Sequence, residues 1–271
     1  MTSTSAPTPH TRAPRPWSLA ILRHLVHAEA RKLPCSPAWW VLLILVVGCA
    51  ALNPSHIGDV ETPETTLQVV LAGWSTTVAA MYGAICITSE YRHRSIATSH
   101  LIAANRPALI LAKMVFAALV GAAYALIAAT TSLIAMALHG LHIGSELPQI
   151  LGVIAVGIPV VALFGILGVG FGALVGKQLP AVLLSPYSLW LLQFLFQFVV
   201  DHFKLLSLSD AETYLPIVTM VYTITESTGG PQIDGSFAIG PPWWLEPLLL
   251  TSYVVLIAAA GIARAQRRDI K

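Results

Sequence analysis

"PQILGVIAVGIPVVALFGILGVGFGALVG" (Pro148–Gly176) is a run of 29 residues without a single charged side chain. A helix needs about 20 largely apolar residues to cross the hydrocarbon core of a bilayer. The rest of the chain has the same character, because 56% of its 271 residues are hydrophobic and only 10% are charged. Soluble domains usually carry about 25% charged residues. The composition therefore predicts a polytopic membrane protein.

Six stretches are long and apolar enough to span, so we expect an all-α membrane fold with six transmembrane helices. The predicted spans are residues 38–53, 68–89, 108–138, 148–176, 179–200 and 245–263. None has Asp, Glu or Arg at its centre, and Lys113 lies near enough to the start of the third span for its amine to snorkel. Residues 1–16 are rich in Pro, Thr and Ser and are predicted to be a disordered cytoplasmic tail. Residues 17–271 are expected to form one transmembrane domain.

Residues 17–33 precede the first span and have the pattern of an amphipathic helix. Cationic and histidine side chains share one face and apolar side chains the other, which is typical of a helix that lies in the membrane interface. Glu29 is the exception, because it projects from the apolar face. It either snorkels to the headgroups or pairs with a cation such as Arg92 or Arg94.

The connection between spans five and six, residues 201–244, is long and contains apolar segments such as 214–224. These are too short to cross a bilayer, so we expect short re-entrant or interfacial helices there.

The orientation of the chain in the membrane follows from the basic residues, because cationic loops stay in the cytoplasm. With the six spans, 14 of the 15 Lys and Arg residues fall on one side, and only Lys204 falls opposite. Both termini are therefore predicted to be cytoplasmic, in a plasma membrane protein.

Motifs for nucleotide binding are not found. Gly168, Gly170 and Ala173 form a G-x-G-x-x-A match, but it lies inside a hydrophobic span with no strand before it. Gly165, Gly168, Gly172 and Gly176 instead predict a face of small residues for close helix packing. Gly176-Lys177 is followed by Gln178, so it does not make a phosphate-binding loop. Any energy source must therefore come from another chain, and no cofactor is expected in this one.

Catalytic and metal-binding patterns are also weak. His139, His142 and Glu146 are interpreted as solvated residues of an outer loop rather than metal ligands. The other carboxylates are scattered without a matched pair, which argues against an enzyme. Within the fifth span, Gln193 and Gln197 share a helix face, as do Phe194 and Phe198. Hydrogen bonding between helices is the usual role of such glutamines, and these four residues are also a candidate lining for a translocation path.

Two stretches resemble type-2 ABC transporter permeases. "HLVHAEARKLPCSPAWWVLLILVV" (His24–Val47) is similar to the start of that family, in which an E-x-x-K element precedes a Trp-containing span; Glu29 and Lys32 match it. "SEYRHRSIATSHLIAANRPALILAKMV" (Ser89–Val115) is similar to the family's loop after the second span. Glu90, Arg106 and Lys113 match there. The chain departs from the family at Arg94-Ser95, where Gly-Thr is usual, and it lacks the proline often found before the Arg.

The resemblance implies the membrane subunit of an ABC exporter that moves a hydrophobic or amphipathic substrate outward. It implies that residues 89–105 form a coupling helix that docks on a separate ATP-binding cassette subunit, which carries ATP and Mg. Arg92 and Arg94 would supply electrostatic contacts to that partner, and Ile96, Leu101 and Ile102 the apolar anchor. Candidates for structural ion pairs are Glu29, Glu90, Arg106 and Lys113. A second membrane subunit, identical or different, and membrane lipid are the other expected partners; nucleic acid is not.

Two other function classes are kept. The first is a non-transporting membrane protein, such as an immunity or anchoring subunit. The second is a membrane-embedded enzyme, which the scattered carboxylates make the weaker alternative. The sequence does not distinguish drug, lipid, peptide and polysaccharide as substrates. A neighbouring gene for a lone ATP-binding subunit would separate the first class from the exporter.

Overall fold

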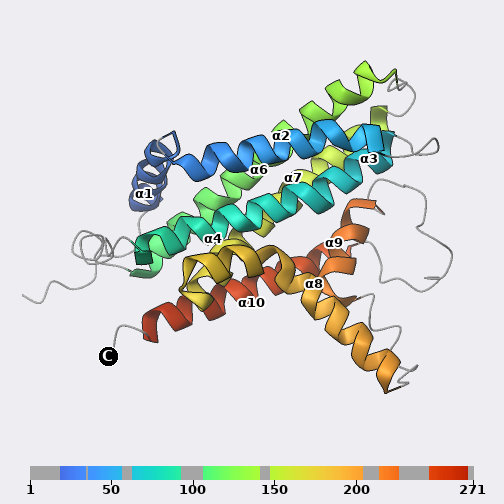
Figure 1. Ribbon diagram of the computed structural model, residues 1–271. Helices are drawn as coiled ribbons and strands as arrows, with labels where there is room; N and C mark the ends of the chain where they lie inside the picture. Colours follow the sequence, from blue (N-terminus) through green and yellow to red (C-terminus); the bar gives the residue numbers. More distant parts are fainter. Residues whose placement is uncertain are drawn as a thin grey trace, which may run out of the picture.

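The computed structural model describes residues 19–34, 36–56, 63–92, 106–140, 147–203, 214–225 and 244–267, which are helical and contain no strand. Figure 1 shows the helices side by side in an elongated bundle. Four of them are long and apolar enough to cross a membrane, and the number rises to six if two bent helix pairs each count as one span. The fold is therefore that of a helical, multi-pass membrane protein.

The helices occupy the predicted segments. They are α1 (Leu19–Lys32), α2 (Pro37–His56), α3 (Pro63–Val69), η1 (Val70–Ser75), α4 (Thr76–Arg92), α6 (Arg106–Leu138), α7 (Leu147–Val175), α8 (Gln178–His202), α9 (Pro216–Thr225) and α10 (Leu245–Arg267). The largest difference is in the second span, which begins at Pro63 rather than at residue 68 and contains the π-helical segment η1. Proline and an acidic residue favour the first turn of a helix, so Pro63 and Glu64 start it in a stretch too polar to predict as a span.

Helix α7 lies at the centre and packs against α4, α6 and α10. Glycines make this approach close. A Cβ atom at Gly168 would collide with the backbone of Ala80 in α4, and one at Gly165 would collide with the backbone of Ala117 in α6. These contacts are backbone against backbone, so no side-chain rotation would relieve them. The predicted small-residue packing therefore serves two neighbouring helices rather than one.

Gly176 has a different role from the one the sequence suggested. It lies after the last residue of α7, with φ of 71°, and its N–H donates to the Gly172 carbonyl at 2.9 Å. A residue in this left-handed conformation is the usual way to end a helix, and glycine adopts it without steric cost. Gly176 therefore ends α7 and turns the chain into α8.

The two ends of the bundle differ in charge. Helix α1, the turn between α7 and α8, and the end of α10 lie towards one end, and α3, α9 and the start of α10 lie towards the other (Figure 1). We call the first the basic end because exposed cations are distributed over it: Arg23, Arg31, Lys32, Lys177 and Arg264. At the other end, Glu64 and Glu246 are buried. This segregation is the pattern from which cytoplasmic termini are predicted.

Two bends shape the bundle. Helices α1 and α2 meet at 77°, and the indole Nε1 of Trp40 donates to the Pro34 carbonyl at 3.2 Å across that turn. Helix α8 bends by 54° near Ser188, just after the internal Pro186. A proline inside a helix removes a backbone hydrogen bond and kinks it. The second half of α8 consequently diverges from the bundle (Figure 1).

Candidate functional site

Helix α1 packs against the basic end of the bundle through one face. Arg23, His24, His27 and Arg31 are exposed, whereas Glu29 is buried, with 8% of its surface accessible. The chief neighbour of α1 is α6. The amphipathic pattern predicted this division of faces, but it did not show what lies opposite the one carboxylate on the packed face.

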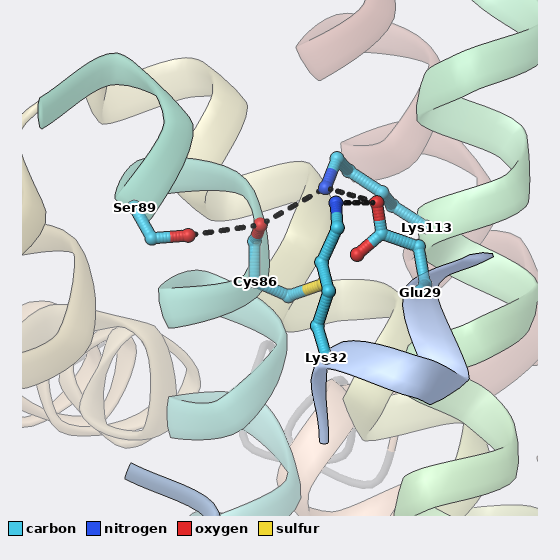
Figure 2. Close-up of polar contacts among 5 residues, drawn as sticks. All are labelled: Glu29, Lys32, Cys86, Ser89 and Lys113. Atoms are coloured by element: carbon cyan, nitrogen blue, oxygen red, sulfur yellow. Dashed lines mark hydrogen bonds and ion pairs between the residues drawn. The ribbon is translucent and has the colours of Figure 1, made fainter. Parts of the chain in front are cut away.

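A buried ammonium group lies opposite Glu29. Figure 2 shows the Nζ atoms of Lys32 and Lys113 both pointing at the same carboxylate oxygen, Glu29 Oε1, at 2.9 and 3.1 Å. Lys113 also donates to the Cys86 carbonyl of α4 at 3.3 Å, and that carbonyl accepts a second hydrogen bond from Ser89 Oγ. Glu29 and Lys113 are 84 residues apart. The network therefore joins three elements: α1, the end of α4 and the beginning of α6.

The two lysines differ in their surroundings. The side chain of Lys113 is only 2% exposed, whereas that of Lys32 is 62% exposed. Burial by itself raises the pKa of Glu29, but the nearby charges of Lys113 and Lys32 outweigh it and leave the pKa below its ordinary value. Glu29 is thus held ionised. A buried ion pair in which each charge keeps hydrogen-bond partners is costly to break from one side.

An aromatic cluster lies on the inner side of this network. The Trp39 ring of α2 stacks on Tyr124 of α6 with centroids 4.7 Å apart, and Tyr82 of α4 meets both edge-on. The Tyr124 hydroxyl donates to the Trp39 carbonyl at 3.3 Å. The rings fix α2, α4 and α6 beside one another next to the docked α1.

The structure brings together two of the four candidates for structural ion pairs, Glu29 and Lys113. Lys113 does not snorkel outward as expected, because its amine lies inside the protein between α1 and α4. Glu90 and Arg106 lie on described helices, but their side chains, like that of Arg92, are outside the described part. The other residues predicted for a coupling helix, Arg94, Ile96, Leu101 and Ile102, lie entirely outside it. What the structure does place is the two ends of that segment: it follows α4, which carries the Cys86 carbonyl, and precedes α6, which carries Lys113.

The four residues proposed to line a path lie on the second half of α8. Phe194, Gln197 and Phe198 are exposed, and Gln193 is half-buried. The three exposed residues do not face the interior of this bundle, because this half of α8 diverges from it (Figure 1), whereas Gln193 lies on the packed side of the helix. A path lined by these residues would need a second molecule to close it.

A cavity of about 730 Å³ opens at the basic end, between the last turns of α4 and the start of α8. Its lining is mostly apolar, with one exposed cation at the α7–α8 turn. The lining residues are Ile85, Thr88, Gly176, Lys177, Gln178, Leu179, Pro180, Val182 and Leu183. The sequence did not predict it, since it depends on where the left-handed Gly176 turns the chain.

No group of three His, Cys, Asp or Glu side chains that could hold a metal ion occurs among the described residues. His139 is exposed at the end of α6, and His142 and Glu146 lie outside the described part.

The Glu29–Lys113 contact could have been found from sequence by one signal: a lysine more than a turn inside an apolar span requires a partner. Comparison of the sequence with known protein families and with curated proteins finds no match.

Proposed function

We propose that this chain is the membrane subunit of an ABC exporter, moving a hydrophobic or amphipathic substrate outward while a separate subunit hydrolyses ATP. One observation carries the proposal. The E-x-x-K element that resembles the start of type-2 permeases and the lysine that resembles the opening of their third span meet at one carboxylate, because Glu29 binds both the exposed Lys32 and the buried Lys113. In this proposal, the E-x-x-K element and the lysine of the third span, which lie far apart in the sequence, serve one purpose.

That purpose is mechanical coupling. The segment between α4 and α6, residues 93–105, starts and ends at helices that the Glu29 network holds together with α1. A force applied to this segment by an ATP-binding subunit would reach α1, α4 and α6 as one unit, since the buried ion pair and the aromatic cluster resist their separation. Arg92 and Arg94 would pair with acidic groups of that subunit, and Ile96, Leu101 and Ile102 would anchor it. Interface energy usually concentrates in such a few buried anchors.

The substrate class rests on two features. The cavity beside α4 and α8 is apolar with a single cation, Lys177, at its edge, which suits a molecule with an apolar body and a polar or anionic end. The aromatic and amide side chains of α8 have the same mixed character. Cytoplasmic termini and a plasma-membrane location complete the proposal, supported by the distribution of cations at the basic end.

The test is purification of the full-length tagged chain from its native membrane in mild detergent. We expect an ATP-hydrolysing subunit to copurify and to be stimulated by substrate. Ile96→Asp should lose both the association and the stimulation. Leu147→Asp is the matched control, because Leu147 is 49% exposed but begins α7 at the opposite end; it should retain both. Full association and turnover in Ile96→Asp would refute the coupling assignment, and a chain that copurifies with no ATPase would instead favour an immunity or anchoring role.

A further inference from the structure

The cavity at the basic end has the form of a wedge between α4 and α8, which we call the α4–α8 wedge. At its closed end the Ser185 hydroxyl of α8 donates to the Ala80 carbonyl of α4 at 3.3 Å. Between this contact and the α7–α8 turn lies a space of about 730 Å³. Its walls are Ile85 and Thr88 on α4, and Val182 and Leu183 with the residues before them on α8. The two helices therefore touch at one point and enclose an open space on the side of the basic end.

The wedge extends from headgroup depth into the acyl chains. Gly176 ends α7, which has 29 residues, and a helix of this length crosses the hydrocarbon core completely. Lys177, the next residue, therefore lies at the level of the headgroups. It is eight residues from Ser185, so at a rise of 1.5 Å per residue the wedge runs along α8 for about 12 Å.

The wedge opens sideways towards the membrane. Leu179 is 72% exposed and Leu183 is 51% exposed, although both line the cavity. They are four residues apart and so lie on one face of α8. Exposed apolar side chains of a membrane-spanning helix contact acyl chains. An acyl chain therefore reaches the space between this face and α4 without passing through water.

A cation marks the headgroup end of the wedge. Lys177 is exposed, and it is the charged member of the lining among the described residues. Its carbonyl accepts a hydrogen bond from the Ala181 N–H at 3.1 Å, which fixes its backbone at the start of α8. Thr88 is the polar residue on the α4 wall, and its hydroxyl donates to the Ala84 carbonyl at 2.6 Å. The wedge thus suits a molecule with one anionic end, at its mouth, and an apolar body.

We propose that the α4–α8 wedge binds an anionic glycerophospholipid of the cytoplasmic leaflet, with its phosphate at Lys177 and one acyl chain between the two helices. Charge complementarity selects this occupant, because anionic lipids give the cytoplasmic leaflet a negative surface that attracts cationic side chains. The methylene groups of Lys177 stay among apolar atoms while its amine reaches the phosphate. The volume of the wedge lies within the range of about 300–1,000 Å³ that is usual for ligand pockets.

This inference deepens the proposed function, because it names the molecule that occupies the cavity before a substrate enters. It rests on that proposal for the cytoplasmic position of the basic end. The two fail separately, since lipid binding is measured on the membrane chain alone. Loss of lipid binding would leave the coupling assignment standing, and a chain that copurifies with no ATPase would still bind lipid at Lys177.

The experiment uses the full-length chain in nanodiscs of phosphatidylcholine that contain a phosphatidylglycerol probe with a photoreactive group in its acyl chain. After illumination, mass spectrometry of the peptides locates the adducts. We expect them on residues 85–88 and 179–183. Added unlabelled phosphatidylglycerol should suppress these adducts, whereas the same amount of phosphatidylcholine should not.

Four variants separate the wedge from its surroundings. Lys177→Gln changes an exposed side chain, so it leaves the fold intact, and it should weaken probe binding about 5-fold, the effect of one cation near an anionic membrane surface. Arg264→Gln is its control, because Arg264 is also an exposed cation of the basic end but lies on α10, outside the lining. Val182→Trp fills the wedge and should abolish the adducts. Leu184→Trp, at an exposed position of α8 outside the lining, should retain them.

Three results would overturn the proposal. Equal weakening by Lys177→Gln and Arg264→Gln would show only a general attraction of the basic end to anionic lipid. Equal suppression by the two unlabelled lipids would show that the wedge does not recognise the anionic headgroup. The absence of adducts on the wedge residues would mean that protein rather than lipid covers them.

Discussion

Removing the carboxylate of Glu29 tests whether one buried contact holds α1 to the bundle. In Glu29→Leu the Lys113 ammonium, 2% exposed, loses its carboxylate partner and keeps its hydrogen bond to the Cys86 carbonyl on the neighbouring helix. Breaking a buried pair from one side costs about 3–5 kcal/mol, because a charge is left without compensation. Removing both charges is far cheaper, so we expect Glu29→Leu/Lys113→Met to recover to within about 1 kcal/mol of the unmodified protein.

Lys32 provides the internal control. It makes the shorter contact with Glu29, 2.9 Å, yet its side chain is 62% exposed. Exposed pairs contribute about 0–1 kcal/mol, so Lys32→Met should change the free energy of unfolding little. The contrast depends on burial rather than on distance, and this is the physical claim under test.

The assay is reversible unfolding of the purified chain in detergent, monitored by the loss of helix content. A second readout detects local undocking: a single cysteine at Val26, on the packed side of α1, should be labelled by a thiol reagent much faster in Glu29→Leu than in the parent. If Glu29→Leu and Lys32→Met cost the same, or if the double variant is no more stable than Glu29→Leu, the reasoning is refuted.

Two further predictions follow from the packing and the charge of this region. Gly168→Ala should destabilise the bundle by about 1–3 kcal/mol, because the added methyl meets the Ala80 backbone. Gly48→Ala is the control and should be neutral or slightly stabilising, because nothing lies within 4 Å of a Cβ atom there. Equal effects of the two substitutions on thermal unfolding would contradict the packing. The lowered pKa of Glu29 means that its contribution is present above the ordinary value of 4.5 and is lost as pH falls through the lowered value. The stability difference between the parent and Glu29→Leu should therefore stay constant from pH 7 to about pH 5.5 and shrink only in stronger acid; a decline already near pH 6 would show that another group controls it.

The predicted helices agree with the structure because the signals that define them are local. An apolar run such as 148–176 needs no tertiary information to be recognised, since hydrocarbon excludes charge and an unpaired backbone. The same holds for the amphipathic pattern around Arg23 and His27. Prediction was less accurate at the second span, where Glu64 lies in the first turn: Gln68, four residues further on in the same helix, donates to it at 3.1 Å, and the tertiary structure buries both side chains.

The sequence by itself determined that the chain is a helical membrane protein, where its helices lie, and that one end of the bundle is basic. Only the tertiary structure decided that Glu29 meets Lys113, that α7 occupies the centre, and that Gly176 ends a helix instead of packing one. The physical reason is the range of the forces involved. Transfer into lipid depends on each segment alone, whereas an ion pair between residues 84 positions apart exists only once α1, α4 and α6 have been packed together.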